Sequence, residues 1–240
     1  MRRIGAAIAL AAVLGACGGG DAGSAPVTVF AASSLTEVFQ AIDPSAEYNF
    51  AGSDDLATQI KEGANPDVYA AASPKYPDEL FAAGLIEQPK IFATNKLVLI
   101  VPKANPAGIH SVADLAQDGV KLVVGAEGVP IGDYTRKVLE NMGASDVLAS
   151  VVSEEDDVKG VVSKVSLGEA DAGFVYATDV KPVADKVTTI ELPEEAQAKV
   201  DYPIAVVKGA DDEEAARAFV ELVLGPEGRQ ALDQAGFGLP

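Results

Sequence analysis

Short apolar segments alternate with amphipathic helical segments along almost the whole chain, and this alternation limits the folds open to it. Strands that are apolar on both faces are typical of sheets covered by helices, and the alternation favours a doubly wound α/β architecture. The expected strands are residues 27–31, 48–50, 68–71, 97–101, 122–125, 173–176, 188–192 and 202–207. The expected helices are residues 35–42, 56–62, 76–83, 112–117, 133–142, 158–167, 211–224 and 227–235.

Two of these strands favour a division into two lobes. Residues 95–102 are strongly apolar and end in a proline, and residues 200–208 form a similar run. If both strands cross between halves of the molecule, the lobes can bend about them over a cleft; a single continuous sheet is the alternative. The expected division is residues 27–95 with 207–240 as lobe 1, 102–200 as lobe 2, and 96–101 and 201–206 as hinge strands.

The amino-terminal segment has the features of an export signal. Arg2 and Arg3 precede an apolar run over residues 4–16, which is too short to span a bilayer. The run ends in Leu-Gly-Ala-Cys at residues 14–17, which resembles a bacterial lipobox with Cys17 as the lipidated residue. An ordinary secretory signal is the alternative. Residues 1–16 are thus expected to be removed, and residues 17–26 to form a flexible tether of roughly 15–18 Å that anchors an extracytoplasmic domain to the cell membrane.

The composition excludes several classes of site. With 36 acidic and 18 basic residues, the formal net charge of −18 argues against a nucleic-acid partner. A single cysteine and a single histidine exclude an internal disulfide, a cysteine-based zinc site and a multi-histidine metal site. The acidic runs 154–157 and 211–214 lack the spacing of a Ca²⁺ loop. We therefore expect no cofactor and no bare metal cation.

The turns that follow the expected strands carry the candidate binding residues. In open α/β sheets, ligands bind where strands end and helices begin, and helix N-termini favour anions. Ser34 and Ser53 lie in two such turns, and Tyr176 closes a strand. Each has a structural alternative, since serine is a common helix cap and a buried tyrosine is often only packed.

Taken together, the turns resemble those of the extracytoplasmic molybdate-binding proteins of ABC uptake systems. The resemblance runs from residue 27 to about residue 238. Its motifs are VTVFAASSL at 27–35, FAGS at 50–53, LATQI at 56–60, GANPDVY at 63–69, NKLVLIVP at 95–102, VPIGDY at 129–134, EDDVK at 155–159, GEADAGFVY at 168–176 and VDYPIA at 200–205.

This resemblance implies a two-lobe type II periplasmic-binding-protein fold, with a mixed sheet in each lobe, that is not an enzyme. It implies molybdate, and also tungstate, as the transported ligand, an ABC permease as the partner, and a monomer. The implied contacts are the hydroxyls of Ser34, Ser53 and Tyr176 and the backbone N–H groups of Ile131 and Val158.

Two alternative functions remain open, and the sequence departs from the family pattern at one point near the candidate site. Another tetrahedral oxyanion such as sulfate would suit the same class, and an extracytoplasmic hydrolase would have to pair His110 with Ser34 or Ser53. One departure from the family pattern is Asp54-Asp55, where small uncharged residues are usual. We expect both carboxylates to face solvent. If either faced the cleft, it would repel a dianion or accept a proton from a ligand such as hydrogen phosphate.

Overall fold

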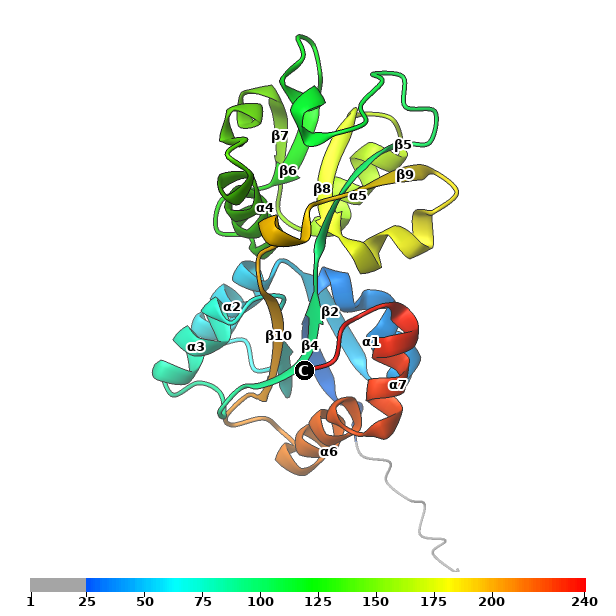
Figure 1. Cartoon of the computed structure of the whole chain (residues 1–240). Coiled ribbons are helices and arrows are strands. Elements are labelled where there is room, and N and C mark those ends of the chain that lie inside the picture. The colour runs from blue at the N-terminus through cyan, green and yellow to red at the C-terminus, as the bar shows by residue number, and fades with distance from the viewer. Residues whose placement is uncertain (1–24) are drawn as a thin grey trace, which may run out of the picture.

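The computed structural model describes residues 25–240. The expected signal at 1–16, Cys17 and the rest of the expected tether up to residue 24 lie outside the described residues. The described chain forms two lobes, each built on a five-stranded sheet flanked by helices (Figure 1). This confirms the α/β class expected from the strand–helix alternation and the mixed sheet in each lobe that the family resemblance implies.

The first lobe has the strand order β2-β1-β3-β10-β4. Strand β1 is parallel to β2 and β3, whereas β10 is antiparallel to β3 and β4. Its strands are β1 (Thr28–Ala32), β2 (Glu47–Ala51), β3 (Val68–Ala70), β4 (Lys90–Asn95) and β10 (Val200–Val206). Its helices are η1 (Ser33–Leu35), α1 (Thr36–Ile42), α2 (Ser53–Lys61), α3 (Lys75–Ala82), α6 (Glu213–Leu224) and α7 (Pro226–Ala235).

The second lobe repeats this arrangement with the order β7-β6-β8-β5-β9. Strand β6 is parallel to β7 and β8, and β5 is antiparallel to β8 and β9. Its strands are β5 (Leu97–Pro102), β6 (Leu122–Gly125), β7 (Val151–Glu155), β8 (Ala172–Tyr176) and β9 (Val187–Glu191). Its helices are η2 (Val112–Ala116), α4 (Pro130–Met142), η3 (Ser145–Ser150), α5 (Val158–Ser166), η4 (Ala177–Val183) and η5 (Glu194–Ala196).

The chain passes between the sheets at places that differ from the expected hinge strands. Residues 97–102 lie wholly in the second sheet as β5, and residues 200–206 lie wholly in the first as β10. The passage falls instead at Lys96, between β4 and β5, and over residues 192–199, between β9 and β10. Where the molecule bends stays a prediction.

Two strands and one helix differ from the expectation. Strands β4 and β7 are sheet edges with only partial burial, so they carry polar residues and show no continuous apolar run. Residues 112–116 form a 3₁₀ helix instead of an α-helix, started by a capping box in which the side chains of Ser111 and Asp114 bind each other's backbone N–H.

The core is formed by the sheets and the helices over them. One cluster of buried side chains extends through both lobes, and Tyr176 of β8 meets Tyr202 of β10 edge to face, with ring centroids 5.8 Å apart. A smaller cluster, including Leu56, Tyr69 and Leu80, lies beneath α2 and α3. Within residues 25–240, no helix is long and apolar enough to cross a membrane.

Strand direction determines where the functional turns meet. The carboxyl ends of β1 and β2 lead directly into η1 and α2, and the amino end of β1 lies at the opposite end of the first sheet. In the second lobe, β6 and β7 lead into α4 and α5. These four helix starts converge on the junction between the lobes.

Candidate functional site

A small cavity lies at this junction, with a volume of about 10 Å³. The cavity is narrow, so the two lobes lie close together around it. Both lobes contribute to its wall: Ala32, Ser33, Ser34, Ala51, Gly52, Ser53, Ala72, Val129, Pro130, Ile131, Asp157, Val158 and Tyr176. The five residues predicted to contact the ligand are all among them.

The serines of the first lobe are buried and neither caps a helix. Ser34 is 5% exposed within η1, and Ser53 is 1% exposed as the first residue of α2. No side-chain capping hydrogen bond is made at either helix start, so the capping interpretation of these serines does not hold. Ser53 Oγ instead accepts a hydrogen bond from the backbone N–H of Ala72 at 3.1 Å. Ser34 Oγ lies 3.1 Å from the hydroxyl oxygen of Tyr202.

The second lobe presents backbone groups from two helix starts. Ile131 is the second residue of α4, after Pro130, and Val158 is the first residue of α5. N–H groups in the first turn of a helix have no partner within that helix. Helix α4 approaches the end of β6 so closely that a Cβ on Gly132 would lie 2.1 Å from the carbonyl oxygen of Ala126. Glycine at this position lets the start of α4 reach the cavity wall.

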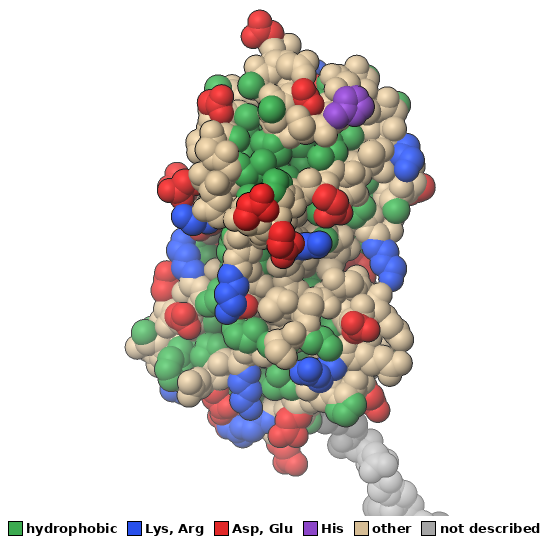
Figure 2. Space-filling view, in the orientation of Figure 1, with side chains coloured by type: hydrophobic (Ala, Val, Ile, Leu, Met, Phe, Trp, Pro, Cys, Tyr) green, Lys and Arg blue, Asp and Glu red, His purple; other side chains and the backbone are tan. Residues whose placement is uncertain are grey.

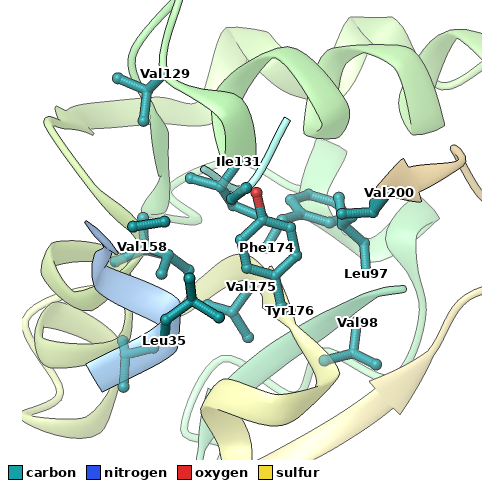
Figure 3. Packing of buried hydrophobic residues seen from close by; sticks show 14 of the residues in the cluster. Leu35, Leu97, Val98, Val129, Ile131, Val158, Phe174, Val175, Tyr176 and Val200 are labelled. Carbon is teal, nitrogen blue, oxygen red and sulfur yellow. The ribbon is translucent and has the colours of Figure 1, made fainter. Parts of the chain in front are cut away.

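Tyr176 has a buried hydroxyl group that lacks a hydrogen-bond partner within residues 25–240. The residue is 1% exposed, and Figure 3 shows its hydroxyl oxygen pointing toward Ile131. Burial raises the pKa of Tyr176 well above its ordinary value, so the hydroxyl keeps its proton and remains a donor. Because buried polar groups are nearly always paired, an unpaired donor on a cavity wall indicates a ligand group.

The cavity wall offers donors without a formal positive charge. Neither Lys nor Arg is among the wall residues, and Asp157 is their single charged member. Its Oδ1 accepts from Gly160 N–H at 2.9 Å, as the N-cap of α5. Each helix start adds a partial positive charge of up to about +0.5. Three hydroxyls and two helix starts can therefore hold an anion that needs donors and no acceptor.

The acidic pair that follows Ser53 is divided between two environments. Asp55 is exposed, as expected. For Asp54 the solvent-facing expectation is wrong: the residue is half-buried, and its Oδ1 is buried without a hydrogen-bond partner within residues 25–240. Burial raises the pKa of Asp54, with a smaller contribution from Asp55. Asp54 is not among the residues that form the cavity wall.

Contacts on both sides of the cavity join the lobes. On one side the Tyr76 hydroxyl donates to the carbonyl oxygen of Gly128, and Lys75 Nζ lies 3.3 Å from Asp133 Oδ2. Figure 2 shows acidic and basic side chains side by side along the waist between the lobes.

On the other side of the cavity, Lys159 of α5 links the lobes. Its Nζ donates to both carboxylate oxygens of Glu37, on α1 in the first lobe, at 2.9 Å. It also lies 3.3 Å from the fully buried Asp179. The sequence does not reveal this triad, although Lys159 directly follows the predicted contact residue Val158.

Similarity to known proteins agrees with this geometry. The pattern of the family described as bacterial extracellular solute-binding protein matches residues 27–238. The molybdate-binding protein ModA of Mycobacterium tuberculosis is 40% identical over 96% of this chain and 95% of its own length. ModA of Escherichia coli is 31% identical over 88% of both chains.

The chain belongs to the bacterial extracellular solute-binding proteins. The fold agrees with this family: the periplasmic molybdate-binding protein of Azotobacter vinelandii superposes with a TM-score of 0.78, covering 89% of this chain and 99% of its own, at 22% identity. Proteins of this family bind solutes and are not a class of enzyme. His110, which the hydrolase alternative requires, is exposed on the second lobe and is not part of the cavity wall (Figure 2).

Within residues 25–240, no group of three or more His, Cys, Asp or Glu side chains is arranged to hold a metal ion. The acidic runs 154–157 and 211–214 serve other purposes in the fold. Asp157 and Asp212 cap α5 and α6 by accepting from backbone N–H groups, and Glu154 pairs with Arg136.

Proposed function

We propose that this chain captures molybdate, and equally tungstate, in the cavity between its lobes and delivers it to an ABC permease. The observation that carries the proposal is the unpartnered, buried hydroxyl of Tyr176. It faces the same cavity as Ser34 and Ser53 and the helix starts at Ile131 and Val158. The molybdate-binding name of the 40% identical relative supports the same ligand.

The chemistry of the ligand suits these donors. Molybdate is a tetrahedral dianion without a proton at neutral pH, so each of its oxygens accepts and none donates. Hydrogen bonds to charged groups contribute about 1.5–3 kcal/mol each. Five such donors account for tight binding without a lysine or arginine at the cavity. The chain's acidic surface then mainly slows the encounter, because charges beyond about 8 Å are screened at physiological salt.

Calorimetric titration with molybdate, tungstate, sulfate and phosphate tests this proposal. Molybdate and tungstate should bind with similar affinity, since they are alike in size and charge, and sulfate should bind more weakly. Sulfate binding more tightly than molybdate would move the assignment to the alternative oxyanion. The absence of heat or thermal stabilisation with both molybdate and tungstate would overturn it.

A lipid anchor at Cys17 completes the proposal, because retention at the membrane would keep the captured anion near the permease. The support is the Leu-Gly-Ala-Cys run before a glycine-rich segment. Replacing Cys17→Ser should move the protein from the membrane fraction to the soluble extracytoplasmic fraction after cell fractionation. A Cys17→Ser protein that stayed with the membranes would exclude lipidation as the means of retention.

A further inference from the structure

Tyr202, at the centre of β10, is not part of the cavity wall, yet it lies directly behind Ser34. Its ring is fully buried, with Phe92, Tyr176 and Phe237 around it in edge-to-face contacts. Its hydroxyl oxygen lies 3.1 Å from Ser34 Oγ and 3.5 Å from Asn95 Nδ2. The hydroxyl group thus lies between the end of β4 and a predicted ligand donor.

The orientation of the Asn95 amide is determined by its other contacts. Its Oδ1 accepts from the backbone N–H of Lys96 at 2.9 Å, which leaves Nδ2 facing Thr178 Oγ1 at 2.9 Å and the Tyr202 hydroxyl. An amide nitrogen only donates. Asn95 Nδ2 therefore offers no acceptor for the proton of Tyr202.

This arrangement gives the bond between Tyr202 and Ser34 a direction. Among the hydrogen bonds of the described residues, Ser34 Oγ is the acceptor within reach of the buried Tyr202 proton. A buried hydroxyl proton without an acceptor would cost about 1–3 kcal/mol. Tyr202 therefore donates, Ser34 accepts, and the proton of Ser34 is left for the cavity.

The hydroxyl group of Ser53 also accepts a hydrogen bond from the protein, but from a different kind of donor. Its Oγ accepts from the backbone N–H of Ala72 at 3.1 Å, so its proton also remains for the cavity. One lone pair of each serine oxygen is thus occupied by a donor from the protein. The donor is main chain at Ser53 and a replaceable side chain at Ser34.

We propose that Tyr202, oriented by Asn95, is a specificity-determining positioning residue that favours the orientation in which Ser34 donates to the ligand and thereby disfavours oxyanions that carry a proton. This inference rests on the proposed function and adds the rule by which the site selects its anion. An unprotonated oxygen accepts from Ser34. If a protonated oxygen of the ligand faced Ser34, two O–H donors would face each other and no hydrogen bond would form between them.

The test compares two tetrahedral dianions of similar size, selenate and arsenate, in mildly alkaline buffer, where arsenate carries one proton and selenate none. Both are measured by competition against molybdate in calorimetry. Tyr202→Phe keeps the ring and removes the proton. Its molybdate affinity should fall about 3- to 10-fold, and the preference for selenate over arsenate should narrow by a similar factor, because Ser34 becomes free to accept.

Asn95→Asp tests the direction of the hydrogen bond between Tyr202 and Ser34 independently. A carboxylate accepts the Tyr202 proton, so Tyr202 then accepts from Ser34, and the lone pairs of Ser34 face the cavity. The added negative charge repels selenate and arsenate equally, so it cancels in their ratio. The ratio should shift toward arsenate at least as far as in Tyr202→Phe.

Tyr48→Phe is the matched control, because its hydroxyl donates to Phe39 O and Asp43 O in the same lobe, away from the cavity. It should leave both the molybdate affinity and the anion ratio unchanged. Unchanged ratios in both Tyr202→Phe and Asn95→Asp, in a protein that still binds molybdate, would overturn this inference alone. A wild-type protein that binds none of the anions would instead overturn the proposed function.

Discussion

At the scale of single residues, the cavity is distinguished by the partners that its polar groups have or lack. Ser34 and Ser53 each accept one hydrogen bond from the protein under the assignment above, and the Tyr176 hydroxyl has no partner within residues 25–240. A residue that serves only packing would not keep an unpaired hydroxyl in its place. Removing the Tyr176 hydroxyl should therefore weaken ligand binding without lowering the stability of the fold.

Replacing Tyr176→Phe should lower molybdate affinity about 10- to 100-fold, because a donor to a charged oxygen is lost. The free energy of unfolding of the ligand-free protein should stay the same or rise, since an unpaired buried hydroxyl is removed. Calorimetry and urea unfolding measure the two quantities. Loss of stability with unchanged affinity would show that Tyr176 is a packing residue.

At the scale of helices and strands, the sequence predicts the interior strands of both sheets, but only two of the four edge strands, β2 and β9. Interior strands such as β1 and β8 are mostly apolar, so their position and the turns after them were predictable. Strands β4 and β7 were not, because a half-exposed edge strand admits polar residues. Ser34, Ser53 and Tyr176 follow from strand-end positions, whereas Ile131 and Val158, which we propose to act through backbone N–H groups, needed the family resemblance.

The residues that sequence reasoning missed act through partners distant in the chain. Tyr202 meets Ser34 across 168 positions, and Lys159 meets Glu37 across 122. Sequence spacing carries no signal for such pairs. Asp54 was placed wrongly for the same reason, since its surroundings include the second lobe, where Asp133 contributes to its raised pKa.

The start of α2 lies against the second lobe at Gly52, and this contact makes a prediction for lobe closure. A Cβ at Gly52 would lie 2.5 Å from the carbonyl oxygen of Asp156, across the junction, and 2.8 Å from Asp54 Oδ1, which can turn away. The backbone at Gly52 has φ −59°, which alanine adopts without strain. Gly52→Ala should therefore hinder closure and leave each lobe folded.

Molybdate affinity of Gly52→Ala should fall at least about tenfold, the equivalent of 1.4 kcal/mol. The free energy of unfolding of the ligand-free variant should differ from that of the wild-type protein by less than about 1 kcal/mol, as at most positions free of internal clashes. Small-angle scattering should show a smaller compaction on adding saturating molybdate. Wild-type affinity in Gly52→Ala would mean that the lobes do not approach as closely in solution.

At the scale of the whole molecule, ion pairs across the junction hold the lobes together. The pair between Lys159 and Glu37 has both carboxylate oxygens at 2.9 Å, and its side chains are 28% and 52% exposed. Partly exposed pairs contribute about 0.2–1 kcal/mol. Because the pair spans the lobes, this contribution belongs to the closed state.

Glu37→Gln should accelerate molybdate dissociation about 1.5- to 5-fold with little change in association. Stopped-flow displacement by excess tungstate measures the dissociation rate. Glu140→Gln is the control, since Glu140 pairs with Lys137 within α4 and joins no two lobes. Equal effects in the two variants would show that surface charge, and not the contact between lobes, governs release.

Asp179, beneath the same lysine, predicts a pH dependence of stability. Burial raises its pKa to about 6, against the opposing charge of Lys159, and Glu37 adds a small further rise. A carboxyl whose pKa is higher in the folded state binds protons on folding, so its contribution to stability is full below its unfolded pKa and is lost as the pH rises through about 6.

Relative to Asp179→Asn, the wild-type protein should therefore gain stability as the pH falls from 7 to 4, by on the order of 2–3 kcal/mol. Urea unfolding of both ligand-free proteins across this range measures the difference. A difference that stayed constant with pH would mean that Asp179 titrates normally, as it would if water reached it.

The point at which the chain enters the first lobe has a consequence for how an anchored molecule is oriented. Strand β1 begins at the end of the first sheet opposite the cavity, and its five residues span about 16 Å. A protein anchored to the membrane through residue 17 would be attached at that end of the first lobe, with its anion-binding cavity facing away from the lipid. The intervening segment reaches at most about 3.5 Å per residue. Transfer of the anion to the permease would therefore require the molecule to tilt toward the membrane. Shortening the intervening segment should impair this transfer while leaving anion binding intact.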